Sequence, residues 1–137
     1  MLAGMPVNDY VEFHDGVVER ITLAADRIDI EFSHLPLYKE EAPNTFGVWA
    51  AKATLSAAGI RSLAIIGAVA REHDSISAGD VSRGGDELAD VDVLRSVADG
   101  TIELLFSQSA ARLHCRASTV SLVIRDAGER FDSYTDE

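Results

Sequence analysis

The sequence has little cysteine, few cations and no long apolar run, and each shortage excludes a class of protein. Cys115 is the only cysteine, so the chain cannot form an intrachain disulfide or a zinc site made of cysteines alone. The longest uncharged apolar stretch, residues 62–70, is too short for the ~20 residues of a membrane-spanning helix. Residues 1–9 have no basic region ahead of an apolar one, so we expect no signal peptide and a cytoplasmic protein.

The shortage of positive charge bears on the choice of partner. Twelve Lys and Arg stand against 23 Asp and Glu, which leaves a net charge of −11. Nucleic acids and anionic membranes are bound by cations that neutralise phosphate, so we expect neither as a partner. The charge fits a basic protein partner or metal ions, and it also fits a protein that is merely soluble.

Length and composition predict one folded domain. A chain of 137 residues has the common domain size, and 47% hydrophobic residues is too much for wholesale disorder. No linker, internal repeat or low-complexity tract divides it. We therefore expect residues 1–137 to form a single domain, with frayed tails at 1–8 and 132–137.

Apolar and polar residues alternate over much of the chain, which predicts β-strands. Ile28, Ile30 and Phe32 are the clearest case, since a polar residue separates each from the next. Residues 10–34 read as a three-stranded meander, with a tight turn at Asp15-Gly16. Residues 35–46 contain two prolines and are expected to form a loop, and residues 71–85 another loop with at most a short strand at 75–77.

Residues 47–58 are ambiguous, because their alanines favour a helix while their alternation favours a strand. We predict two strands around Ala58-Gly59. Residues 87–98 have helical spacing, with Asp86 or Asp90 as the N-cap, and residues 101–106, 112–117 and 119–125 return to strand. The expected fold is mainly β: an antiparallel β-sandwich or half-open barrel of about eight short strands with one helix at about 87–98.

His14-Asp15 is the most conspicuous candidate for catalysis. A His-Asp pair supplies two metal ligands in helical phosphohydrolases, but here it ends a strand and enters a turn, which favours a structural role. His34, His73 and His114 are scattered, so a two- or three-histidine metal site depends on strand adjacency that the sequence does not show.

Other catalytic signatures are missing. We find no Gly-x-Ser-x-Gly elbow, no phosphate loop and no dinucleotide fingerprint, and the acids Asp86, Asp90 and Asp92 lack the order of a calcium loop. The sequence thus favours a non-enzymatic protein, and we expect no metal and no cofactor. Trp49, with Tyr38 and Phe46 before it, fits either an aromatic lip on an interface or core packing.

A resemblance adds to this interpretation. The start Tyr10-Val11-Glu12-Phe13-His14-Asp15-Gly16, the amphipathic hairpin after it, Trp49 leading into Ala53-Thr54-Leu55, and the GI-x-x-LAI-x-G segment at 59–67 resemble a set of small bacterial all-β domains of unknown function. Some of those domains are assigned as immunity proteins of toxin systems. The resemblance implies a compact β-fold, a cytoplasmic location and a role in binding a protein.

Three hypotheses follow. The first is a binding module or inhibitor for a basic protein, whose contact residues would be Tyr38, Glu40, Glu41, Trp49, Asp86, Asp90 and Asp92. The second is a small-molecule- or metal-dependent enzyme that uses His14 and Asp15, joined by His34 or His73. The third is a structural homodimer formed through an uncovered strand edge in residues 101–125.

Overall fold

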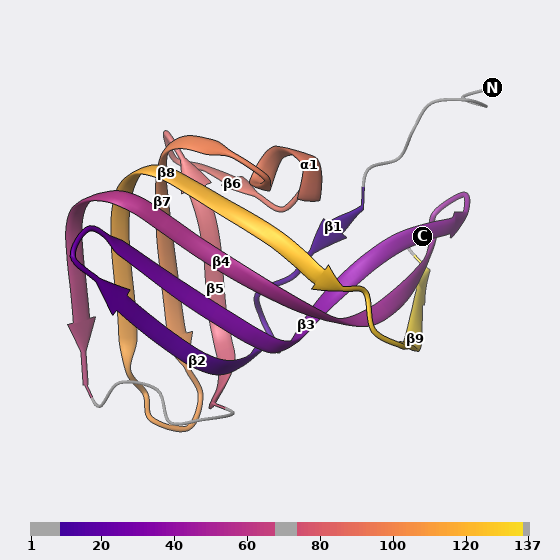
Figure 1. Ribbon diagram of the computed structural model, residues 1–137. Helices are drawn as coiled ribbons and strands as arrows, with labels where there is room; N and C mark the ends of the chain where they lie inside the picture. Colours follow the sequence, from indigo (N-terminus) through magenta and orange to yellow (C-terminus); the bar gives the residue numbers. More distant parts are fainter. Residues whose placement is uncertain (1–8, 68–73, 136–137) are drawn as a thin grey trace.

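The computed structural model of the chain describes residues 9–67 and 74–135. Within these ranges the chain forms nine antiparallel strands in one sheet and a single short helix (Figure 1). The mainly-β prediction, a sandwich or half-open barrel, is confirmed. The elements are β1 (Tyr10–Val11), β2 (Val17–Ala24), β3 (Arg27–Ala42), β4 (Thr45–Ile66), β5 (Asp74–Arg83), β6 (Asp86–Leu88), α1 (Val91–Leu94), β7 (Val97–Phe106), β8 (Arg112–Asp126) and β9 (Arg130–Thr135).

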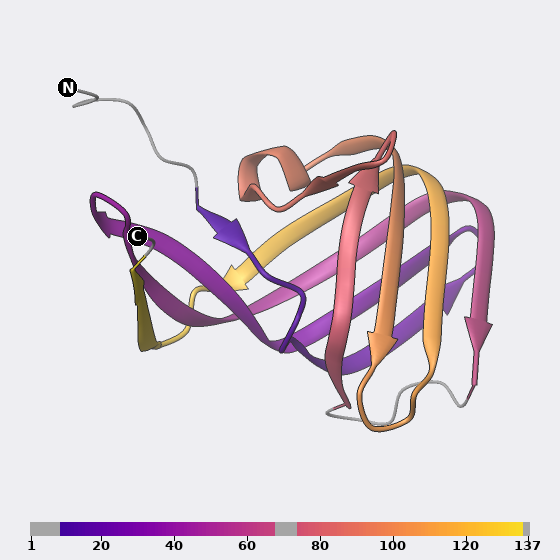
Figure 2. The same ribbon diagram turned by 180° about the vertical axis from the view of Figure 1, so that it is seen from behind.

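Six of the strands form a ring. The order β2-β5-β7-β8-β4 is closed by β3, which pairs with β4 on one side and with β2 on the other (Figure 2). The ring is weakest between β2 and β5, which share only the pairs Val17–Ser75 and Val18–Asp74. Asp74 is fully buried there, and its carboxylate accepts hydrogen bonds from the backbone of Gln108 and from the Ser109 hydroxyl, at 3.0 and 2.8 Å.

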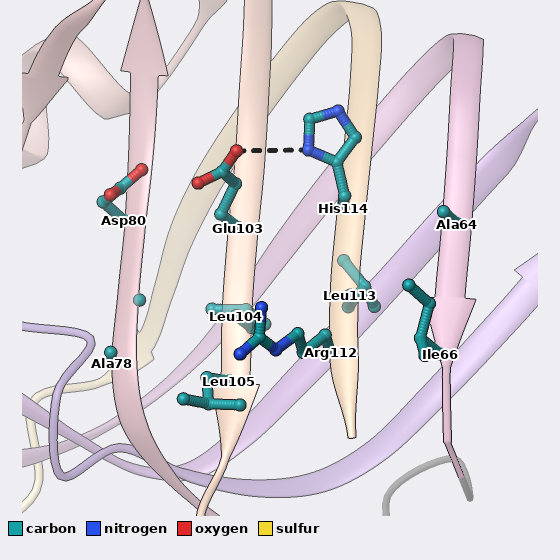
Figure 3. A pocket seen from close by; sticks show the side chains of 11 residues that line it. Ala64, Ile66, Ala78, Asp80, Glu103, Leu104, Leu105, Arg112, Leu113 and His114 are labelled. Carbon is teal, nitrogen blue, oxygen red and sulfur yellow. Dashed lines mark hydrogen bonds and ion pairs between the residues drawn. The ribbon is translucent and has the colours of Figure 1, made fainter. Parts of the chain in front are cut away.

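The core fills the inside of this ring. Side chains alternate across each strand, so Ile28, Ile30 and Phe32 of β3 are fully buried, as the sequence predicts. Ala53 and Ala57 of β4 are also fully buried, and their small size leaves room for larger side chains from the facing strands. The outward side chains of β5, β7 and β8 can be followed in Figure 3.

Residues 35–46 do not form the predicted loop. They belong to β3 and β4, and only a two-residue turn at 43–44 separates these strands. Pro36 is tolerated because it stands where β3 changes neighbour from β2 to β1. Its carbonyl accepts a hydrogen bond from the Glu12 N–H at 3.1 Å, so its nitrogen faces the same side and the β3–β4 ladder loses no donor.

The predicted helix at 87–98 is also wrong in extent. Residues 86–88 pair with 81–83 as β6, the helix covers only Val91–Leu94, and β7 begins at Val97. Asp90 is the N-cap, since its carboxylate accepts from the Asp92 and Val93 N–H groups at 2.8 and 3.2 Å. Leu94 and Val97 are spaced as in a helix, but Leu94 reaches the core from α1 and Val97 reaches it from β7.

Three further segments differ from the prediction. β4 is one strand through Ala58-Gly59, where Gly59 takes a positive φ of 66° just before a register shift between Ile60 and Ser62. Residues 74–83 form a full strand rather than a loop. Residues 132–135, predicted as a frayed tail, pair with β4 as part of β9, whereas 1–8 and 136–137 lie outside the described residues.

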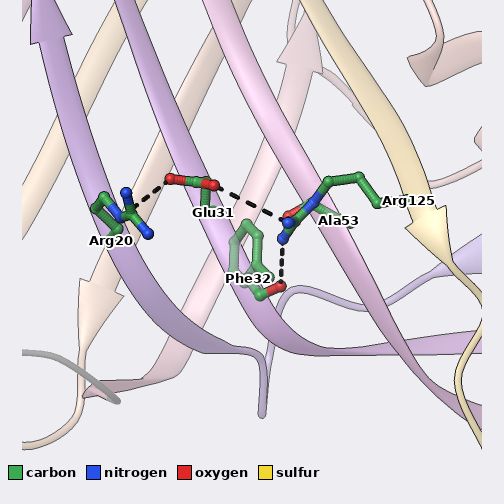
Figure 4. A network of polar contacts seen from close by, with 5 residues as sticks. All are labelled: Arg20, Glu31, Phe32, Ala53 and Arg125. Carbon is green, nitrogen blue, oxygen red and sulfur yellow. Dashed lines mark hydrogen bonds and ion pairs between the residues drawn. The ribbon is translucent and has the colours of Figure 1, made fainter.

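Bulges bend the sheet where β3 and β4 leave the ring. Register shifts fall between Phe32 and Leu35 of β3 and between Lys52 and Ala53 of β4. Arg125 joins the strands at this level, and its Nη2 donates to the carbonyls of Phe32 and Ala53 at 3.3 and 3.5 Å (Figure 4). These bonds link the backbones of β3 and β4 to β8 beside the bulges.

Beyond the bend lies a four-stranded extension: β1, residues 35–42 of β3, residues 45–51 of β4, and β9. The link from β8 to β9 depends on Gly128, which has a positive φ of 72° and whose N–H donates to the Asp126 carboxylate at 2.8 Å. A Cβ at Gly128 would collide with the carbonyl oxygen of Ala50.

We predict that Gly128→Ala lowers the free energy of unfolding by more than ~2 kcal/mol, because strain at positive φ is joined by a backbone collision. Gly84→Ala is the matched control: Gly84 has a positive φ of 60° but nothing within 4 Å of an added Cβ. It should cost about 1 kcal/mol. Urea unfolding of both variants makes the comparison, and equal losses would contradict the tight approach at Gly128.

Candidate functional site

Four aromatic side chains gather on one face of the extension, one from each strand. We call Tyr10, Tyr38, Phe46 and Tyr134 the aromatic face. Tyr10 stacks on Tyr38 with ring centroids 4.6 Å apart, and Phe46 meets Tyr10 edge-on at 5.3 Å. Tyr134 lies 6.2 Å from Tyr38 and 6.5 Å from Phe46. Strand register explains the cluster, because Tyr10 pairs with Tyr38 and Phe46 pairs with Tyr134.

The aromatic face is open to solvent at its β9 side. Tyr134 is 47% exposed and its strand neighbour Phe131 is 53% exposed, with the His34 ring 5.2 Å from Phe131. Burial lowers the pKa of His34, and the carboxylate of Asp15 acts against that shift. Exposed aromatic side chains that lie together are typical of protein interfaces.

Acids surround the aromatic face. The Tyr38 hydroxyl donates to the Glu12 carboxylate at 2.7 Å, and burial together with that carboxylate raises the pKa of Tyr38 far above its ordinary value. Glu40 lies two residues beyond Tyr38 and is paired with Phe46, so it points to the same side. Asp132 lies two residues before Tyr134 and shares its face. The face therefore offers aromatic rings within a negative rim.

The cations of the extension point to its opposite face. Lys39 places its ammonium 5.1 Å from the centre of the Trp49 ring. Arg130 makes two hydrogen bonds to the Glu41 carboxylate, at 2.9 and 2.7 Å, and thereby lowers the pKa of Glu41. Trp49 and Glu41 thus contact their own chain, on the face turned toward α1, while Tyr38 and Glu40 belong to the aromatic face. The four predicted contact residues of the extension are therefore split between its two faces.

The remaining predicted binding acids lie elsewhere. Asp86 is exposed at the start of β6, Asp90 caps α1, and Asp92 pairs with Arg95 at 3.2 Å. None of them belongs to the extension. The capping of α1 gives Asp90 the structural role that the sequence left open.

His14 and Asp15 form a pair at the turn before β2. Their side chains meet at 3.2 Å, Glu12 lies 3.6 Å from the same His14 nitrogen, and both residues of the pair are more than half exposed. Asp15 has a positive φ of 68°, and its N–H donates to the Ile76 carbonyl at 2.9 Å, so it shapes the turn. Among residues 9–67 and 74–135 no group of three or more His, Cys, Asp or Glu could hold a metal. His73 lies outside the described residues.

The other singled-out residues take structural positions. Cys115 is fully buried in β8, and burial raises the pKa of its thiol, as expected for a small core residue. His114 points outward and contacts Glu103 at 3.2 Å. Residues 101–106 of β7 pair with β5 and, apart from Phe106, with β8, and residues 112–120 of β8 pair with β4 and β7. Residues 121–124 of β8 pair with β4 alone, so the homodimer through this region stays a prediction.

Sequence reasoning missed Tyr10, Phe131 and Tyr134. Their faces depend on strands β1 and β9, which are short and lie at opposite ends of the chain. The sequence did contain one sign of a site here, since Phe131 and Tyr134 flank Asp132-Ser133. The acidic composition of this segment led us to expect a frayed tail instead. Pairing with β4 gives this segment its place.

Comparisons of the chain with protein-family models, with curated proteins and with solved structures give no match. In the described part of the chain, no helix has the length and apolar character needed to cross a membrane.

We predict that Tyr38→Phe changes how stability depends on alkaline pH. The folded chain keeps the Tyr38 proton above the ordinary pKa of 10.0, whereas the unfolded chain releases it. This contribution is therefore fully present below that pH and is lost as pH rises further. Urea unfolding between about pH 9 and pH 11 should show a steeper loss for the natural chain than for Tyr38→Phe. Glu12→Gln, which removes the hydrogen-bonded carboxylate, should also reduce the loss; three parallel curves would contradict the assignment.

Proposed function

We propose that the protein is a non-enzymatic binding module whose aromatic face docks a basic, extended segment of a partner protein. One observation carries this proposal: four strands each contribute an aromatic ring to one surface, acids rim that surface, and the cations of the extension point away from it. A surface that only keeps the protein in solution would not need its acids on one face of the extension and its cations on the other.

Arginine and lysine fit this surface for two reasons. Their cationic groups are attracted to the faces of aromatic rings, and arginine also pairs with carboxylates through a planar fork. Glu40 and Asp132 are placed to accept such a fork on either side of the rings. A net charge of −11 adds long-range attraction, which speeds the encounter with a basic partner.

The open edge of β9 favours an extended segment. Within the described residues β9 pairs only with β4, so its other edge has no strand partner. A partner strand could add there and bring its side chains onto Phe131 and Tyr134. The resemblance to immunity-type domains agrees with this role, since an acidic inhibitor can mimic the anionic substrate of a basic toxin.

The test uses a short capped peptide of alternating Arg and Thr, with the same peptide carrying Glu in place of Arg as the probe control. We predict that the natural chain binds the Arg peptide, that added salt weakens the binding, and that the Glu peptide does not bind. The double variant Glu40→Lys with Tyr134→Ala should bind at least about tenfold more weakly.

Asp86→Lys is the matched control, because it reverses one acidic charge outside the extension. Its affinity should remain close to that of the natural chain in isothermal titration calorimetry. If Asp86→Lys weakens binding as much as the double variant, the peptide responds to net charge alone and the aromatic face is not the docking surface.

A further inference from the structure

A second surface, on the outside of the ring, has the composition of a small-molecule site. Strand register places outward side chains of β5, β7, β8 and β4 in two neighbouring rows. We call the first the acid row and the second the arginine row. The acid row is Asp80, Glu103, His114 and Ala64, and the arginine row is Ala78, Leu105, Arg112 and Ile66.

The two rows line a depression of about 390 Å³, which is in the size range of small-ligand sites (Figure 3). Figure 3 shows Asp80, Glu103 and His114 side by side at one level, with the Arg112 side chain reaching across β7 at the next. Ala78, Leu105, Ala64 and Ile66 give the depression apolar walls. Because the rows are two residues apart along each strand, they are spaced about 7 Å apart at the backbone.

The two carboxylates of the acid row repel one another. Asp80 and Glu103 stand directly opposite one another on paired strands, an arrangement that destabilises a sheet. Partial burial raises the pKa of Asp80, and the charges of Glu103 and Glu87 add to the shift. His114 contacts Glu103 but not Asp80. A bound cation would remove this repulsion.

Arg112 supplies the opposite charge at the other end. Its backbone belongs to the β8 ladder, but its side chain forms no hydrogen bond or ion pair with any residue in the described ranges. The guanidinium is therefore available to an anionic group, for which its fork geometry is suited. Together, the acid row, the apolar walls and the Arg112 guanidinium match a molecule with a positive charge at one end, a negative charge at the other and an apolar chain between them.

We propose that this depression binds a small zwitterion, with its ammonium group at Asp80 and Glu103, its carboxylate at Arg112 and a short alkyl chain between them. This site is separate from the aromatic face and does not depend on the function proposed for it. The assignment follows from the row spacing, because a molecule that is too short reaches only one of the two charged ends.

The probes are 5-aminopentanoate, whose charged ends lie about as far apart as the two rows, and the single-charge analogues pentylamine and pentanoate. Amide NMR spectra of the full chain should show saturable shifts with 5-aminopentanoate at residues 64, 78, 105 and 114, with millimolar affinity. Each analogue should bind at least about fivefold more weakly, since it loses one charge-assisted contact.

Two variants separate the ends of the site. Glu103→Gln should weaken binding of 5-aminopentanoate and pentylamine, whereas Arg112→Gln should weaken binding of 5-aminopentanoate and pentanoate but not of pentylamine. Arg116→Gln is the matched control, because Arg116 is two strand positions from His114 on the same outward face but does not line the depression. Its affinities should be unchanged.

All three side chains are outward, so the variants should keep the fold, which unchanged amide spectra without probe would verify. The proposal is overturned if 5-aminopentanoate gives no saturable shifts at these residues. It is also overturned if pentylamine binds as tightly as 5-aminopentanoate, or if Arg112→Gln and Arg116→Gln behave alike.

Discussion

The pairing of β3 with β4 is the interaction on which the rest of the structure depends. It runs from Arg27–Ala58 to Ala42–Thr45, with a register shift between Glu40 and Ala42, next to the turn, and an interruption between Phe32 and Leu35. On the near side of that interruption the pair closes the ring and buries Ile28 and Ile30. On the far side the same pair continues as the centre of the extension and positions β1 and β9 on its flanks. One continuous hairpin thus supports both the core and the aromatic face.

The interruption separates the ring, which is stabilised by its buried core, from the extension, whose outer strand is stabilised mainly by pairing with its neighbour. Ring strands have a fully buried side, whereas β9 is exposed along its length and depends on pairing with β4 and on the tight link at Gly128. Arg125 lies at the boundary, where it bonds two backbone carbonyls and reaches Glu31 at 3.9 Å, which in turn pairs with Arg20. A surface at such a junction is well placed for binding, because a partner can add to it without disturbing the core.

The ring was predictable from the sequence because alternation is a local signal. Ile28 to Phe32 and Leu113 to Cys115 show which residues face inward without any knowledge of their neighbours. The extension was not predictable, since Pro36 and Pro43 both suggest a loop. The structure shows that Pro36 stands at a position of β3 where the β3–β4 ladder needs no N–H donor, and that Pro43 lies in the turn. The aromatic face was beyond sequence reasoning for a similar reason: Tyr10 and Tyr134 come together only through strands that neither of them belongs to. From the sequence we grouped Tyr38, Glu40 and Glu41, in a predicted loop, with Trp49 of the next strand. The pleat of β3 and β4 puts Tyr38 and Glu40 on one face and Trp49 and Glu41 on the other.

The most direct test of the account is to locate where a basic chain contacts the protein. Amide NMR spectra of the full chain, recorded during addition of the Arg–Thr peptide, report contact residue by residue. The account predicts that the largest shifts fall in β1, residues 38–46 and β9, and that the ring strands β5 and β7 change little. Shifts spread in proportion to surface acidity, or centred on residues 86–92, would contradict a docking surface built from the extension.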